Sequence, residues 1–259
     1  MNCSRDTGDE LMASLLAEGI NLILPPRDNI APGDLIIADQ QGGARLGGWR
    51  EVFNLQLRPQ IATDAGFKSF QFKASSVLKV GVAASVMGRV LQAFGLGSGS
   101  FSGAFSSANA DTIKLSIIAP ANKELTNFDA VLAQMNEARA EPTQGYSDRR
   151  FFVVIKVWRA RGIRISVADK SSKHVDLSAK AVEELTAKAK MELKREDTGS
   201  YAFIAGSQLI FGLTLREVIY KDGAIVDVAP TEPLKFRGKG PAEPFAFIGD
   251  DAFVDLPES

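Results

Sequence analysis

The stretch from Phe70 to Ile118 most constrains the fold, because its apolar residues fit a helix and a strand equally well. Spaced for a helix, one apolar face would consist of Leu78, Val82, Val86, Val90 and Phe94. Spaced for a strand, apolar residues from Leu78 to Val90 alternate with a smaller and more polar set. The run ends in Gly, Ser and Phe at residues 95–107, and a clear strand alternation follows at residues 112–117. We therefore expect this segment to be able to adopt two structures.

A second stretch, residues 178–195, has the same double pattern. As a helix it would be capped by Ser178 and would place on one face Val182, Leu185, Ala189 and Leu193. As a strand, the sequence LTAKAKMELK at 185–194 alternates strictly, which gives one apolar and one charged face. Because Ala, Leu, Lys and Glu favour helices, we expect both double-patterned stretches to be helical in the resting protein.

The clearest strand in the chain is Arg150–Trp158, an apolar run rich in Val and Phe. It is predicted to turn near Arg161–Gly162 and to return at residues 163–168 as the second strand of a β-hairpin. The tip would be strongly basic, with a lysine behind it: Arg159, Arg161, Arg164 and Lys156. Each basic side chain near an anionic membrane contributes about 1 kcal/mol to binding, so these residues are candidate membrane contacts.

The remaining patterns predict an α+β protein. Strands are predicted at 21–27, 35–37, 201–220 and 224–228, a helix capped by Asn127 at 127–140, and a Gly-rich loop at 41–48. The long strand is predicted to break near Gly206 and Gly212, and Lys221–Gly223 predicts a tight turn. The expected fold is a central, twisted, mostly antiparallel β-sheet with flanking helices, convertible hairpin regions and a docked C-terminal tail.

The composition limits the classes of protein to which the chain can belong. With 259 residues, 45% hydrophobic and 24% charged, it can bury a full core as one large domain or two small ones. A net charge of -1 argues against a nucleic-acid partner. No continuous apolar run is long enough for a transmembrane helix, and no signal peptide is visible, so we expect a cytoplasmic protein.

Cysteine and histidine are too scarce for most catalytic or metal sites. The chain has one His, His174, and one Cys, Cys3, so no intramolecular disulfide can form. We therefore expect neither an enzyme nor a bound cofactor. Cys3 lies almost at the N-terminus, where it is either an incidental thiol on a mobile end or a site of S-acylation.

The C-terminal residues differ in character from the rest of the chain. Residues 230–244 are rich in Pro and Gly, which predicts an exposed linker. Residues 244–259 contain no Lys or Arg and combine acidic residues with apolar ones: Phe245, Phe247, Ile248, Phe253, Val254 and Leu256. This segment is too apolar for plain disorder and too short to fold alone, so we expect it to dock on the body. The predicted division is a body at 1–234 and a linker with tail at 235–259.

Together these features resemble a bacterial gasdermin. The resemblance rests on Cys3, a Leu-rich first helix at 9–18, the strands NLILPP (21–26) and PGDL (32–35), the two convertible regions and the short tail. It implies a latent pore-forming protein of antiphage defence, monomeric and cytoplasmic until a caspase-like protease removes the tail. The cut protein would then oligomerise into a large β-barrel pore in the inner membrane. The resemblance also implies a palmitoyl group on Cys3.

The linker indicates where a protease would act. The exposed cleavage region is Phe236, Arg237, Gly238 and Lys239. A protease specific for basic residues would cut after Arg237 or Lys239, and one specific for apolar residues after Phe236 or Leu234. The alternative function is a soluble α+β binding or scaffold module without membrane activity, in which residues 70–118 form a buried helix and a flexible loop.

Overall fold

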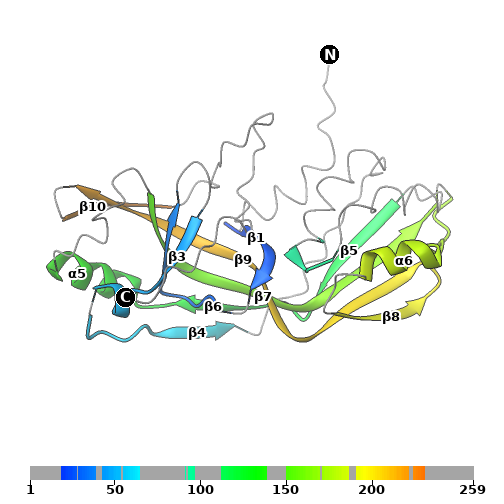
Figure 1. The fold of residues 1–259 in the computed structure, drawn as a ribbon, viewed down its shortest axis with the longest axis horizontal. Coiled ribbons are helices and arrows are strands. Elements are labelled where there is room, and N and C mark those ends of the chain that lie inside the picture. The colour runs from blue at the N-terminus through cyan, green and yellow to red at the C-terminus, as the bar shows by residue number, and fades with distance from the viewer. Residues whose placement is uncertain are drawn as a thin grey trace, which may run out of the picture.

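The computed structural model describes residues 19–27, 29–38, 43–53, 55–64, 91, 93–96, 112–138, 150–169, 171–186, 191–221 and 224–230, and the structural statements below concern these ranges. Within them the chain forms one antiparallel sheet of 10 strands, in an elongated molecule with short helices (Figure 1). None of the helices in these ranges is long and apolar enough to span a membrane.

Two long strands form the axis of the sheet. They are β7 (Arg150–Ala168), of 19 residues, and β9 (Ser200–Lys221), of 22 residues. They pair antiparallel along most of their length. The other edge of β7 is covered in turn by β2 (Asp34–Ala38), β6 (Ala121–Leu125) and β5 (Thr112–Ile118). The other edge of β9 is covered by β10 (Ala224–Pro230), β1 (Asn21–Arg27) and β8 (Met191–Asp197). Outside them, β3 (Gly43–Gly48) pairs with β2, and β4 (Ile61–Asp64) pairs with β6.

The part of the sheet at the start of β7 is packed on both faces. One face carries the buried cluster Ile23, Ile30, Ile36, Phe152, Val154, Val157, Ile210, Leu213 and Leu215. The other packs against α2 (Trp49–Phe53) and α5 (Phe128–Ala138) through Leu35, Trp49, Phe53, Leu55, Leu125, Phe128, Val131, Met135, Val153, Ile155 and Val218. Because both faces are covered, β7 is continuously apolar from Phe151 to Ile155.

A bulge divides the central ladder into two halves. Ala160 lies opposite Leu209, but Gly162 lies opposite Ile204, so β9 advances five residues where β7 advances two. The extra residues of β9 include three exposed ones: Gly206, Ser207 and Gln208. We call the sheet up to Ala160 of β7 the proximal half. The distal half consists of β5, β8, β7 from Gly162 onward and the part of β9 that pairs with them, together with α6 (Ala179–Thr186). In Figure 1, α5 and α6 lie at opposite ends of the molecule.

The predicted hairpin with a basic tip at Arg161–Gly162 is wrong, because β7 continues through these residues as one strand. A Cβ atom at Gly162 would lie 1.9 Å from the carbonyl oxygen of Phe203. Glycine is therefore needed here for the close passage of two strands. The local sequence suggests a turn, whereas the pairing partner that keeps β7 extended comes much later in the chain.

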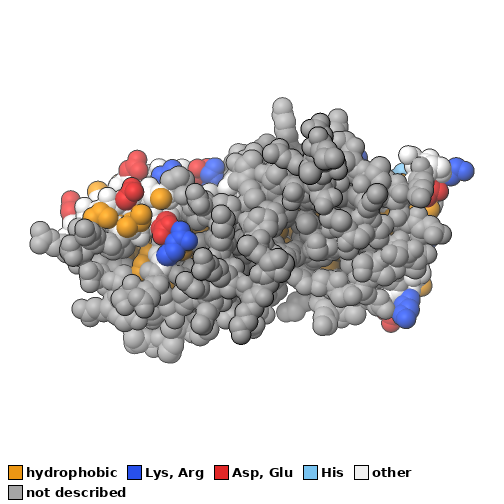
Figure 2. Space-filling view, turned by 90° about the horizontal axis from the view of Figure 1, so that it is seen from above, with side chains coloured by type: hydrophobic (Ala, Val, Ile, Leu, Met, Phe, Trp, Pro, Cys, Tyr) orange, Lys and Arg blue, Asp and Glu red, His pale blue; other side chains and the backbone are white. Residues whose placement is uncertain are grey.

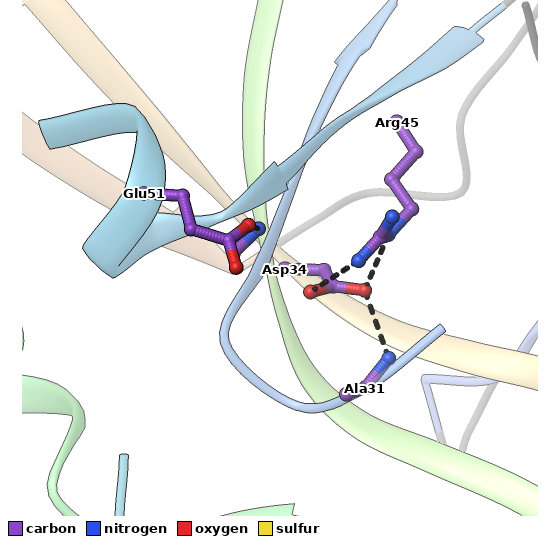
Figure 3. A network of polar contacts seen from close by, with 5 residues as sticks. Ala31, Asp34, Arg45 and Glu51 are labelled. Atoms are coloured by element: carbon purple, nitrogen blue, oxygen red, sulfur yellow. Dashed lines mark hydrogen bonds and ion pairs between the residues drawn. The ribbon is translucent and has the colours of Figure 1, made fainter. Parts of the chain in front are cut away.

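The predicted loop at 41–48 is wrong from Gly43 onward, where the chain forms β3 against β2. Arg45 Nε donates to Asp34 Oδ2 at 2.7 Å, and Arg45 Nη2 donates to Asp34 Oδ1 at 3.3 Å (Figure 3). The Asp34 side chain is only 5% exposed and also accepts from the Ala31 backbone N–H at 2.9 Å. A buried carboxylate needs such partners, so this ion pair holds the β2–β3 hairpin in register.

The helix predicted at 127–140 is confirmed over 128–138 as α5, with its expected apolar face buried at Phe128, Val131 and Met135, and residues 139 and 140 lie outside the described ranges. The side chain of Asn127 makes a long-range contact. Its Oδ1 accepts from the Gln60 backbone N–H at 2.9 Å and its Nδ2 donates to the Arg58 carbonyl at 3.0 Å. Asn127 therefore attaches the 55–60 segment to the start of the helix.

Several predicted strands are confirmed in place, namely those at 21–27, 35–37, 112–117 and 224–228. Two residues of the predicted turn, 222 and 223, lie outside the described ranges, and on either side of them β9 pairs antiparallel with β10, starting with Lys221 and Ala224. The break near Gly206 corresponds to the bulge. The break near Gly212 is wrong, because Gly212 pairs with both Trp158 and Leu22.

The two double-patterned stretches differ in how much of them is described. In the first, the residues from Leu78 to Val90 lie outside the described ranges. In the second, the predicted helix is right up to Thr186, where α6 ends, and wrong from Met191, where β8 begins. The edge of β9 offers hydrogen-bond partners to β8, and this pairing overrides the local helix preference.

Candidate functional site

The four basic residues predicted to contact a membrane are spread along β7. At about 3.3 Å per residue, Lys156 and Arg164 are roughly 25 Å apart along the strand. Lys156 Nζ lies 3.0 Å from Glu124 of β6, whereas Arg161 is exposed. Arg159 is half-buried, and its Nε has no hydrogen-bond partner among the described residues. The structure therefore spreads these four residues along one strand and does not gather them at a hairpin tip. Their contact with a membrane remains a prediction.

The distal half is an amphipathic sheet with the strand order β5–β7–β9–β8. One cross-strand row is apolar: Ile117, Ile163, Phe203 and Leu193. The next row lies on the opposite face and is mostly polar: Ser116, Arg164, Ala202 and Lys194. Ile163 and Phe203 are fully buried, while Lys194 is exposed. Such alternation suits a sheet with one buried face in water, and it also suits strands with one face towards lipid.

Ion pairs and hydrogen bonds hold the polar face and the far rim of the distal half. Across β9, Arg164 donates to Glu196 of β8, from Nε at 2.5 Å and from Nη2 at 2.8 Å. At the rim, Asp176 Oδ1 accepts from the Gly199 backbone N–H at 2.8 Å and from the Tyr201 hydroxyl at 3.1 Å. Arg195 Nη2 donates to Asp176 Oδ2 at 2.5 Å.

These partners change the proton affinities of the groups at the rim. The backbone N–H of Gly199, with Tyr201 and Arg195, lowers the pKa of Asp176. The hydrogen bonds from Arg164 lower the pKa of Glu196 and raise that of Arg164 itself. Burial raises the pKa of the Tyr201 phenol. The distal rim is therefore held together best while its carboxylates are ionised.

Sequence reasoning did not single out Asp176, Glu196 or Tyr201. Asp197–Gly199 between two alternating runs carries a turn signal, which could have located the β8–β9 turn. No local signal in the sequence indicates the contact between Gly199 of this turn and Asp176, because the two residues meet only after β8 and β9 have paired.

The other predicted site residues lie outside the described ranges. They are Cys3, the cleavage region at 236–239 and the tail residues at 245–256. His174 is exposed, as expected. Among the described residues, no group of three His, Cys, Asp or Glu side chains is placed to hold a metal ion.

The proximal end carries exposed apolar side chains. Ile219 of β9 is 38% exposed and Val226 of β10 is 54% exposed. In Figure 2 hydrophobic side chains gather at the end that carries β10 and α5, with acidic and basic side chains among them. β10 is also the last described element before the predicted linker.

The comparisons with known proteins agree on one family. The model of the Bacterial Gasdermin Family matches residues 23–224. A gasdermin, bGSDM, of Bradyrhizobium tropiciagri is 89% identical over 259 residues, which cover 100% of both chains. A gasdermin of the same name from Lysobacter enzymogenes is 21% identical and covers 95% of this chain and 96% of its own. A solved structure of a bacterial gasdermin from Bradyrhizobium tropiciagri superposes with a TM-score of 0.69 at 80% identity, again over 100% of both chains.

Proposed function

Because this chain belongs to the bacterial gasdermin family, and is a latent, non-enzymatic pore-forming protein of cell death in antiphage defence, we propose that proteolysis of its linker switches it on. The observation that carries the function is the identity of 89% over the full length of both chains. It decides between the two functions weighed from the sequence, in favour of the pore former and against the binding or scaffold module.

Residues 235–259 act as the inhibitory tail, and residues 1–234 as the body that forms the pore. Each tail aromatic that is fully buried on the body contributes about 1.5–3 kcal/mol. Exposed Ile219 and Val226, on the hairpin directly before the linker, offer the tail an apolar surface. While attached, the tail acts at an effective concentration near the millimolar range, and a cut removes this advantage. A caspase-like protease makes the cut between Phe236 and Lys239.

The cut protein, a monomer while latent, assembles into a closed β-barrel, in which every backbone polar group is paired. The distal half supports this proposal, because its four strands already separate an apolar from a polar row. Extension of the stretches at 70–118 and 178–195 would supply the roughly 9–11 residues that each membrane-spanning strand needs. The basic residues of β7 contact the anionic lipid: Lys156, Arg159, Arg161 and Arg164.

A palmitoyl group on Cys3 assists insertion. Each buried CH₂ of an acyl chain contributes about 0.8 kcal/mol to membrane binding. The protein is cytoplasmic while latent and moves to the inner membrane after the cut. An intact-mass spectrum of the chain from its native host should show the added mass of one acyl chain on Cys3, and a spectrum with only the free thiol contradicts this part of the proposal.

Dye release from vesicles of phosphatidylcholine and phosphatidylglycerol tests the activation. A site for a sequence-specific protease is inserted between Phe236 and Gly240, and the chain is assayed before and after cutting. We expect release only after the cut. The matched control carries the same protease site after Ser259, where cutting leaves the tail attached, and it should stay silent. Release from the uncut chain, or none from a cut chain that is still folded, contradicts the proposed activation.

A further inference from the structure

The segment before α6 is tied to the turn between β8 and β9. The Val167 backbone N–H donates to the Gly199 carbonyl at 2.8 Å, and the Val175 N–H donates to the Val167 carbonyl at 3.1 Å. Gly199 has a φ of +67°, and a Cβ there would lie 2.7 Å from the carbonyl oxygens of Val167 and Val175. Val175 and Asp176 therefore lie directly against the turn, with no room for a side chain at Gly199.

The side chain of Asp176 closes this contact with three different elements. Its Oδ1 binds the turn through Gly199 and binds β9 through Tyr201. Its Oδ2 binds β8 through Arg195. Hydrogen bonds to an ionised acceptor are stronger than neutral ones, so a single carboxylate holds the segment, the turn and both strands together.

The hydroxyl of Tyr201 adds two hydrogen bonds to this contact. Its hydroxyl donates to Asp176 and accepts from the Leu177 backbone N–H at 2.8 Å. Tyr201 and Leu177 are 3% and 6% exposed, so loss of the hydroxyl would leave a buried N–H without its partner. The network thus joins a buried contact to an exposed ion pair.

The position of the network in the chain suggests its role. Asp176 lies two residues before the double-patterned stretch at 178–195, and Arg195 is the last residue of that stretch, which contains α6 and the start of β8. Met191 pairs with Ala205 and Asp197 with Ser200, so extension of β8 backward from Met191 leads away from the turn. A change of this stretch from helix to strand must therefore draw Asp176 away from Gly199. We propose that the Asp176 network is a latch, which holds the segment leading into α6 against the β8–β9 turn and whose release limits the rate of pore formation after the tail is cut. This inference rests on the proposed function.

The test compares two aspartates of the same segment. Within the described ranges, the bonds that Asp169 Oδ1 accepts are short-range and come from the Ser171 N–H and hydroxyl and from the Lys173 N–H. Asp169→Asn therefore makes the same chemical change as Asp176→Asn without touching the contact with the turn. Tyr201→Phe is a second latch variant, which keeps the buried ring and removes only the hydroxyl.

Two measurements are made on the wild type and the three variants. In the uncut chains, hydrogen exchange at the Leu177 and Gly199 amides should be faster in D176N and Y201F than in the wild type and D169N. In the cut chains, D176N and Y201F should release dye several-fold faster than the wild type, and D169N should match the wild type.

The failures of the latch and of the proposed function can be told apart. A cut wild-type chain that releases no dye contradicts the pore activation. The exchange measurement on uncut chains does not depend on pores, and equal exchange in D176N and D169N overturns the latch by itself. Equal or slower dye release by D176N and Y201F, with a cut wild type that leaks, also overturns it.

Discussion

The two halves of the sheet share the same long strands but are held in different ways. The proximal half is packed on both faces by apolar clusters, with α2 and α5 covering one of them. The distal half has one apolar row and one polar row, and its polar face and rim carry the Arg164–Glu196 pair and the Asp176 network. The bulge between Ala160 and Gly162 separates the two halves.

This difference has consequences for how each half can open. Burial of apolar area in the proximal half is insensitive to protonation and only weakly sensitive to salt. Charge-assisted hydrogen bonds in the distal half depend on ionised carboxylates, and the ion pairs Arg164–Glu196 and Arg195–Asp176 are exposed to solvent. Local opening free energies can differ within one fold, so the proximal half is suited to remain as a platform while the distal half rearranges.

The largest expected effect comes from the centre of the proximal core. Phe152 is fully buried, and Phe152→Ala should destabilise the whole protein by about 3–5 kcal/mol through lost burial and the cavity left behind. Urea denaturation measures this change. Phe203→Ala, at an equally buried site of the distal half, is the matched comparison. It should speed hydrogen exchange mainly in β5, β8 and α6, and uniform exchange in both variants would refute the division into halves.

Gly162→Ala should have the next largest effect. A Cβ would lie 1.9 Å from the Phe203 carbonyl oxygen, and a clash with backbone forces the strands apart at a cost of about 1–3 kcal/mol. We expect weaker protection of the distal amides with little change in the proximal ones. Gly206→Ala is the control, because a Cβ there would meet nothing within 4 Å. Similar destabilisation by both variants would show that the boundary between the halves does not depend on the close contact at Gly162.

A smaller, pH-dependent effect should separate the halves without any mutation. The pKa values of Asp176 and Glu196 are lowered in the folded protein, so both carboxylates bind protons less readily in the folded state than in the unfolded state. Their contribution to stability is therefore present above the pKa of the unfolded chain and is lost as the pH falls through the folded pKa. Arg195 and Tyr201 face Asp176, and Arg164 and Lys194 act on Glu196, so acidification weakens these contacts through the two carboxylates. Exchange measured at decreasing pH, corrected for the intrinsic rate, should rise first in the distal half; earlier loss of the proximal half would contradict this order.

The smallest effect is expected from the exposed ion pair of Lys156 with Glu124. Surface pairs contribute about 0–1 kcal/mol, and both side chains are at least 30% exposed. Lys156→Gln should leave the urea midpoint nearly unchanged while it reduces dye release from anionic vesicles, if Lys156 contacts lipid. The same loss with purely zwitterionic vesicles would mean that the residue acts in some way other than by lipid contact.

Much of the fold could be predicted where the signal is local. The apolar spacing of Phe128, Val131 and Met135 predicts α5, the alternation of Ile113, Leu115 and Ile117 predicts β5, and Lys221–Gly223 predicts the β9–β10 turn. For the candidate site, the sequence points to the 178–195 stretch as able to form both helix and strand. It does not point to Asp176 or Tyr201, because their contact depends on residues that are distant until the sheet forms.

What the sequence determined by itself is the set of local periodicities, the scarcity of Cys and His, and the family to which the chain belongs. Only the tertiary structure decided three other features. β7 stays extended through Gly162 because β9 runs close beside it. β3 forms where Arg45 pairs with Asp34. Within residues 178–195, the helix α6 is followed by the strand β8, because the edge of β9 offers hydrogen-bond partners there. In each case the local sequence only weakly favoured one secondary structure or favoured two, and backbone hydrogen bonds or an ion pair across the sheet decided which one formed.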